Sequence, residues 1–358
     1  LVLLAATFLA PQFGAIGLIG LCISLAAALV LGFDREQIRS GALLFNSLLV
    51  SFALVFLYNY QHLSLPVLAM VLTCSVVVTV FVTVFTAHSL HTLFRLPSMS
   101  LPFVTVTLLL FFLFYSFTRT PITASTPYVL LPEIPCPWMA MRCFLQAFGA
   151  IFFLPHATVG LVIFIALLCH SRLAGLYAVV GFAAGMLVMH GLHMDITPAG
   201  MAYVGFNFVF CAIALGGIFF VPSKSSLLLV VLGAFFCATI AIAVRSFLLY
   251  FGVPPLALPF NLVVLLMVYT MRLRTSVRHC FCTPFTPDRP EVNVRNFKTD
   301  LRRFPDALHP SLFLPFFGER TVTQGFNGAI THRGQWRYGL DFEVLDTQGS
   351  RYNRDDGS

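Results

Sequence analysis

Long apolar runs broken by short polar stretches fill the first three quarters of the chain. A membrane-spanning helix needs about 20 apolar residues, so the longer runs predict full crossings and the shorter ones predict half-helices. The runs comprise residues 1–10, 14–32, 40–58, 64–93, 103–117, 138–154, 158–169, 173–192, 199–221, 224–250 and 260–271. This pattern predicts an all-α polytopic membrane protein.

Two apolar segments stand out because each contains a pair of prolines five residues apart. They are Leu96–Phe103, with the sequence LPSMSLPF, and Val253–Phe260, with the sequence VPPLALPF. Proline removes a backbone donor and stops a helix. Lipid cannot satisfy the freed backbone groups, so a broken helix at membrane depth must be buried in protein or line a cavity. A matched pair of such breaks indicates the central site of a transporter.

The two proline segments close two halves that share further landmarks in the same order. The matched landmarks are Ala5 to Phe8 with Ala150 to Phe153, Asp34 with Asp195, and Phe45-Asn46 with Phe206-Asn207. We therefore expect an inverted repeat of two five-helix halves with broken or re-entrant helices. Phe8 and Phe45 are 37 residues apart, whereas Phe153 and Phe206 are 53 apart, so the first half is 16 residues short. We place the absent helix at the counterpart of the Arg172–Met186 region.

Composition and charge divide the chain further. The protein is 58% hydrophobic and 10% charged, and only 12 of its 35 charged residues fall in residues 1–270. The expected parts are a first repeat (1–117), an inter-repeat linker (118–137), a second repeat (138–271), a basic, proline-containing linker (272–308) and a β-rich tail (309–358). Basic residues just past a last span follow the positive-inside rule, so we expect a multi-pass protein of the inner (plasma) membrane and no nucleic-acid partner.

The doubled proline motif and the paired Phe-Asn segments resemble the urea transporter family. The resemblance covers about 270 residues and implies a homotrimer in the lipid bilayer, with a narrow pore between the inverted halves of each subunit. It also implies passive passage of urea without a cofactor. Such a pore is physically reasonable, because aromatic faces select a planar solute and a ladder of carbonyl and hydroxyl oxygens replaces its water hydrogen bonds.

By motif, the resemblance places a set of side chains along this slit. They are Ala6, Phe8, Phe45, Leu49 and Ser100 from the first half and Ile151, Phe153, Phe206, Phe210 and Ala257 from the second. The sequence lacks a polar side chain of the family at three positions. Of the family's two central threonines, one falls on Ser100, which keeps a hydroxyl, and the other on Ala257, which does not. The family's polar residue ahead of the aromatic pair falls on Ala5 and on Ala150. Each lost hydrogen bond to a desolvated solute costs about 1 kcal/mol, which weakens the expectation of urea flux.

Other polar residues in the apolar runs are expected to have structural roles. Asn46 and Asn207 are expected to hydrogen-bond between helices rather than to contact solute. Asp34 and Asp195 are expected to cap helices. His190 and His193 lie three apart, a spacing open to a metal pair, but an interfacial position is the preferred interpretation.

The tail contains glycine turns between short β-branched and aromatic runs, which predict strands. Its segment from Thr323 to Phe342 resembles the start of lysostaphin-like zinc peptidases, and the resemblance implies His332 and Asp341 as metal ligands. A catalytic zinc needs three protein ligands and an open position, and the family's later His-x-His is not in this sequence. Zinc is therefore expected only if the domain continues beyond residue 358, and this chain alone is not expected to be an enzyme.

Three functions remain open. The preferred one is channel-like passive transport of urea or a close small amide. The alternatives are a membrane-anchored lysostaphin-like zinc endopeptidase acting on peptidoglycan, incomplete in this chain, and a non-conducting relic of a transporter.

Overall fold

The structure is a computed structural model, and it describes most of the membrane part and a section of the tail. The described residues are 9–33, 35–39, 41–57, 64–118, 129, 132–135, 138–194, 198–251, 253–274, 279–283, 288–303, 321–328 and 330–343. The expectations for Ala5, Ala6, Phe8, Asp34 and Asp195 fall outside these residues.

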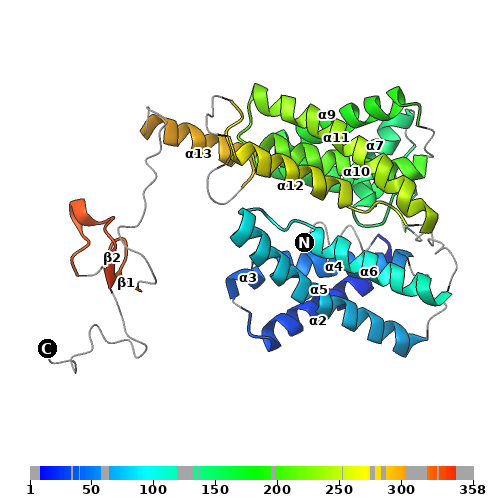
Figure 1. The fold of residues 1–358 in the computed structure, drawn as a ribbon, viewed down its shortest axis with the longest axis horizontal. Helices are drawn as coiled ribbons and strands as arrows, with labels where there is room; N and C mark the ends of the chain where they lie inside the picture. The colour runs from blue at the N-terminus through cyan, green and yellow to red at the C-terminus, as the bar shows by residue number, and fades with distance from the viewer. Residues whose placement is uncertain are drawn as a thin grey trace. The chain divides into compact units, whose positions relative to one another are not determined.

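Each apolar run that lies among the described residues forms a helix, as predicted, because the backbone in a membrane must satisfy its own hydrogen bonds. The first half contains α2 (Pro11–Val30), α3 (Arg35–Arg39), α4 (Ala42–Leu57), α5 (Leu65–Phe94) and α6 (Leu101–Thr118). The second contains α7 (Met139–Ala150), α8 (Ala157–His170), α9 (Arg172–Gly191), α10 (Pro198–Ile213), the π-helical η2 (Ala214–Ile218), α11 (Lys224–Leu248), η3 (Leu249–Phe251) and α12 (Leu258–Arg272). Figure 1 shows these halves as two helix groups, one above the other.

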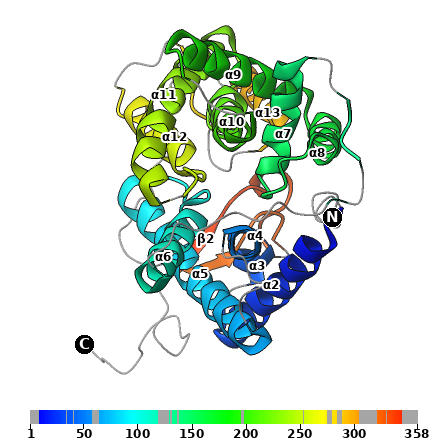
Figure 2. The same cartoon turned by 90° about the vertical axis from the view of Figure 1, so that its right-hand side faces the viewer.

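Five of the described helices are long and apolar enough to cross a membrane. Helix α10 with η2 is the most enclosed of them, because 78% of its most apolar window is buried against 33% to 44% for the other four. Figure 2 shows α10 surrounded by α7, α9, α11 and α12, all of which it contacts. The chain is therefore a polytopic α-helical membrane protein in which α10 forms the centre of the second half.

The two halves run in opposite directions. Helix α12 ends beside the end of α5, where the Arg272 guanidinium donates to the Arg95 carbonyl and the rings of Phe94 and Tyr269 lie 5.9 Å apart. Helix α6 ends beside the end of α11, where Phe112 and Phe251 meet at 5.3 Å. Helices α6 and α12 each begin at a proline break, and each ends beside the helix that precedes the break of the other half. The two halves are therefore antiparallel, and the predicted inverted repeat is confirmed for the described helices.

The helix absent from the first half is the counterpart of α8, and our placement of the gap at Arg172–Met186 was wrong. Helix α2 corresponds to α9, because Gly20 packs on Ser51 of α4 as Gly181 packs on Ala212 of α10. The equivalent residues of the two halves have the same spacing: Gly181 lies 161 positions after Gly20 (181 − 20), and Ala212 lies 161 positions after Ser51 (212 − 51). Small residues let these helices approach closely in a membrane. The region around Arg172 therefore has its counterpart in α2, and the shortfall lies before it.

The segment expected as a linker after Met271 is partly folded onto the second half, which corrects that expectation for its described residues. Thr283 N donates to Phe219 O (3.0 Å), and Val221 N donates to Phe281 O (2.8 Å). Helix α13 (Pro290–Arg303) follows. It docks by its own polar side chains, as Asn293 Nδ2 donates to the carbonyl oxygens of Gly217 (2.8 Å) and Ile218 (3.3 Å). Those carbonyls sit at a helix end that lacks intrahelical partners.

Residues 303–358 form a second compact unit, separate from residues 1–302. Its described part contains strands β1 (Thr321–Gln324) and β2 (Asp341–Glu343) and the 3-10 turn η4 (Gly334–Trp336). The strands pair antiparallel, with Val322 opposite Phe342. The expected β-rich fragment is thus present.

Candidate solute pore

The proline break of the first half is held by Asn46. Its amide Nδ2 donates to Met99 O (3.4 Å), and its Oδ1 accepts from Phe103 N (3.3 Å), near the start of α6. One side chain therefore satisfies a carbonyl and an N–H that the break leaves without helical partners. Met99 has a φ of 45°, a left-handed conformation that costs a non-glycine residue on the order of 1–3 kcal/mol.

The second half repeats this arrangement atom for atom. Asn207 Nδ2 donates to Leu256 O (3.0 Å), and Asn207 Oδ1 accepts from Phe260 N (3.2 Å). Leu256 has a φ of 49°. The prediction that both asparagines hydrogen-bond between helices is confirmed, and each one stabilises the tip of a broken helix.

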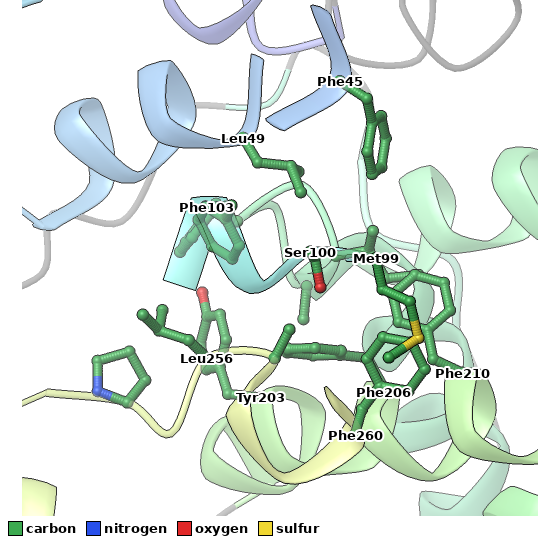
Figure 3. Close-up of a pocket in the computed structure, with 15 residues that line it drawn as sticks. Phe45, Leu49, Met99, Ser100, Phe103, Tyr203, Phe206, Phe210, Leu256 and Phe260 are labelled. Atoms are coloured by element: carbon green, nitrogen blue, oxygen red, sulfur yellow. The ribbon is translucent and has the colours of Figure 1, made fainter. Parts of the chain in front are cut away.

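A cavity of about 270 Å³ lies between the two tips. Eight of the predicted slit residues are among those described, and all eight line it. They are Phe45, Leu49, Ser100, Ile151, Phe153, Phe206, Phe210 and Ala257. Figure 3 shows Phe45 and Leu49 entering from one side and Phe206 and Phe210 from the other, with Ser100 between them. The fold therefore brings both halves of the predicted set together at one place.

The tips contact each other directly. Asn261 Nδ2 donates to Ser100 Oγ (2.9 Å) and to Ala257 O (2.6 Å). Asn261 is fully buried, whereas its counterpart in the first half is Val104. Because the amide already donates to Ser100 Oγ, the Ser100 hydroxyl hydrogen is left to donate to another acceptor.

The cavity wall is almost wholly apolar. Phe103, Phe153 and Phe260 extend the aromatic lining, with Phe103 and Phe153 at 6.0 Å and Phe210 and Phe260 at 5.3 Å. Asn46 and Asn207 engage one carbonyl in each break, Met99 O and Leu256 O, and Ser100 supplies a hydroxyl between the tips. The expected ladder of oxygens is therefore reduced here to a short polar point in an aromatic chamber.

Sequence reasoning missed Tyr203 and Asn261. Tyr203 lies one helical turn before Asn207, lines the cavity and packs its ring 5.4 Å from Phe56. Its hydroxyl is buried and has no hydrogen-bond partner among the described residues. Nothing in the repeat marks Tyr203, because its counterpart is Ala42. Asn261 could have been found, since it is the polar residue that follows the second proline motif where the first has valine.

In the tail, His332 and Asp341 lie side by side, with His332 Nε2 3.1 Å from Asp341 Oδ1. The other ring nitrogen, Nδ1, lies 2.9 Å from Gly325 O. No group of three or more possible metal-ligating side chains occurs within the described part of the chain. The two residues predicted as ligands thus lie within hydrogen-bonding distance of each other, and the prediction of a metal there stays a prediction.

An inverted helical repeat whose two broken helices meet at an aromatic cavity defines a multi-pass α-helical membrane protein. The chain belongs to the urea transporter family: the family model described as "UT: Urea transporter" matches residues 1–272. This membership confirms the resemblance predicted for the membrane part and favours a transporter over an enzyme.

Curated relatives agree with this assignment. The chain is 26% identical over 260 residues to "Urea transporter 1" of Ovis aries and of Capra hircus, which is 70% of this chain and 66% of each relative. It is 26% identical over 237 residues to "Urea transporter 1" of Mus musculus, covering 64% of this chain and 60% of that relative. The chain thus spans slightly less than two thirds of the length of these relatives.

Proposed function

We propose that the protein lets urea, or a close small amide, pass down its gradient through the cavity between the two broken helices. The observation that carries the proposal is the convergence of eight predicted slit residues from both halves on one cavity. Family membership over residues 1–272 supports it. The relatives named as urea transporters support the choice of solute.

The aromatic chamber suits a flat neutral solute. Phe153, Phe206 and Phe210 offer ring faces and edges, and aromatic rings pack well against planar groups. Ser100 would donate its hydroxyl hydrogen to the carbonyl oxygen of urea, because Asn261 occupies the serine oxygen as a donor. A single such hydrogen bond offsets part of the cost of desolvation, about 1 kcal/mol, and weak binding lets the solute leave again.

The proposal includes the assembly and location implied by the family resemblance. The subunit would form a homotrimer in the inner (plasma) membrane. Large apolar side chains exposed on the outer helices, such as Leu29, Phe85 and Leu228, would face lipid or a neighbouring subunit. The mass of the detergent-solubilised protein, measured by native mass spectrometry, would test the trimer, and a monomer would contradict it.

Stopped-flow light scattering on proteoliposomes tests transport. We expect urea efflux faster than from empty liposomes. A rate equal to that of empty liposomes would refute transport and leave a non-conducting relic of the same fold. Circular dichroism on the same sample shows that a negative result is not caused by unfolding.

The tail suggests a second candidate function, that of a lysostaphin-like peptidase module. The specific observation is the contact of His332 with Asp341, with the other imidazole nitrogen beside a backbone carbonyl. Carbonyls in that position orient zinc-binding histidines. His332 and Asp341 are two of the three protein ligands that a catalytic zinc needs, so zinc would supply a polarised water for peptide hydrolysis only if a third ligand completed the site. We expect the full chain to bind zinc only weakly by isothermal titration, and His332→Ala to abolish it; equal binding by the variant would refute the assignment.

A further inference from the structure

A basic cavity of about 500 Å³ lies where α8 ends, α9 begins and α13 packs against both. Three arginines and a histidine line it: Arg172 at the start of α9, Arg289 and Arg295 on the α13 segment, and His170 at the end of α8. Since α9 is one of the helices long and apolar enough to cross a membrane, its first residue would lie near the membrane boundary. The cavity would then lie at the level of lipid headgroups.

The positive charge of this cavity is only partly neutralised. Glu291 is the one acid that lines it. Its carboxylate already accepts hydrogen bonds from Ser171 Oγ (2.7 Å) and Leu173 N (2.9 Å) and so covers the amides that open α9. Arg172 and Arg295 make no ion pair with any residue that the structure describes. Three guanidinium groups against one carboxylate leave two positive charges facing the cavity.

An apolar groove of about 640 Å³ continues from the basic cavity, and Cys169 and His170 line both. The groove follows α8 past Ile163 and Ala166, between α7 and α10. Its far end is formed by Phe45, Ile151 and Phe210, which also line the solute cavity. The combined site is therefore charged at the membrane boundary and apolar from there to the middle of the protein.

We propose that this site binds one anionic phospholipid, with the phosphate in the basic cavity and an acyl chain in the groove. Guanidinium groups pair phosphate oxygens in a bidentate manner, and basic pockets between membrane helices suit lipid headgroups. A free anion would use the cavity but leave the groove empty, whereas a zwitterionic lipid would not use the excess charge. The acyl chain would end at Phe45 and Phe210 and so close the side of the solute cavity.

Native mass spectrometry of the full chain in detergent tests the proposal without reference to urea flux. The probes are phosphatidylglycerol, phosphatidylcholine of the same acyl chains, and inorganic phosphate. We expect phosphatidylglycerol to bind best. Replacing Arg172, Arg289 and Arg295 by Gln, singly and together, should weaken it roughly fivefold per arginine, as about 1 kcal/mol per basic residue implies.

Two further variants separate the headgroup from the acyl chain. Lys298→Gln with Arg302→Gln removes two exposed charges of α13 that do not line the cavity, and it should leave phosphatidylglycerol binding unchanged. Ala166→Trp fills the groove. It should weaken the binding of phosphatidylglycerol and leave the binding of inorganic phosphate unchanged. Equal binding of the two lipids, an equal loss in the control, or displacement of lipid by millimolar phosphate would each overturn the proposal. The single Arg295→Gln variant, exposed on α13, keeps the test valid if the triple variant fails to fold.

Discussion

The two halves of the membrane part hold their broken helices in the same way but line the cavity between them differently. Asn46 and Asn207 make equivalent pairs of hydrogen bonds to the tips. In contrast, the position of Ser100 in the first half is occupied by Ala257 in the second, and Tyr203 of the second half lines the cavity whereas its counterpart Ala42 does not.

This difference separates the requirements of the fold from those of the pore. A backbone carbonyl or N–H freed at membrane depth has no water to bond, so its partner is needed in both halves. A side chain that merely lines the cavity has no such backbone group depending on it. The lining can therefore differ between halves while the tips stay superimposable in their hydrogen bonds.

The largest expected effect comes from breaking one tip. Asn207→Leu leaves Leu256 O and Phe260 N without the bonds of 3.0 and 3.2 Å. We expect a loss of roughly 2–6 kcal/mol of stability, about 1–3 for each buried unsatisfied group. Asn46→Leu should cost less, because its bonds are longer. Unfolding in mixed detergent micelles measures both, and equal costs would show that bond length does not distinguish the halves.

The next comparison is at the helix crossings. Gly181→Ala would place a methyl group against Ala212 Cβ and 2.9 Å from Phe208 O, neither of which can rotate away. Gly20→Ala would meet mainly the Ser51 hydroxyl, which can rotate away at the cost of its 2.8 Å hydrogen bond to Ser47 O. We expect Gly181→Ala to destabilise the protein by roughly 1–3 kcal/mol through overpacking, and Gly20→Ala by clearly less. Thermal unfolding of the two variants decides, and a larger loss for Gly20→Ala would contradict the comparison.

The third comparison concerns flux and rests on the proposed function. Phe206 is 7% exposed and Phe45 is 38% exposed, so added bulk at Phe206 has less room to move aside. Phe206→Trp should slow urea efflux roughly tenfold, the effect of about 1.4 kcal/mol on a barrier, and Phe153→Trp should act similarly. Phe45→Trp should slow efflux less. Unchanged flux in the first two variants would remove them from the path.

A smaller effect is expected from the Ser100 hydroxyl, which lies between the two tips. Ser100→Ala removes the hydroxyl that Asn261 orients and should slow urea efflux roughly fivefold, or about 1 kcal/mol. Ala257→Ser adds a hydroxyl at the matching position and should raise efflux. Thiourea, a poor acceptor at its sulfur, should respond less to Ser100→Ala than urea does. An identical response would show that Ser100 does not contact the carbonyl oxygen.

The smallest effect is confined to the second half, where α13 covers the start of α9. Burial by itself raises the pKa of Glu291, but hydrogen bonds from Leu173 N and Ser171 Oγ outweigh it, so its pKa is lowered. A lowered folded pKa means that the carboxylate stabilises the fold above its unfolded pKa and loses that effect as the pH falls through the folded value. The difference in melting temperature between wild type and Glu291→Gln should therefore shrink in acid. A constant difference would contradict this role.

Much of the fold and of the cavity could be predicted from the sequence. Apolar runs dictated the helices because lipid leaves the backbone no other choice, and prolines dictated the breaks at Pro97 and Pro254. The repeat then brought Phe45 and Phe206 to one site. The gap in the first half was misplaced, because α2 and α9 match through the spacing of Gly20 and Gly181 rather than through a motif.

The chain's sequence alone determined that two interrupted helices occur in equivalent places, since hydropathy and proline act locally. Only the tertiary structure decided which groups meet across the pseudo-symmetry: the contact of Asn261 with Ser100, the burial of Tyr203, and the docking of α13 beside Arg172. Those contacts join residues more than a hundred positions apart. No local pattern encodes them, because they depend on how whole helices pack.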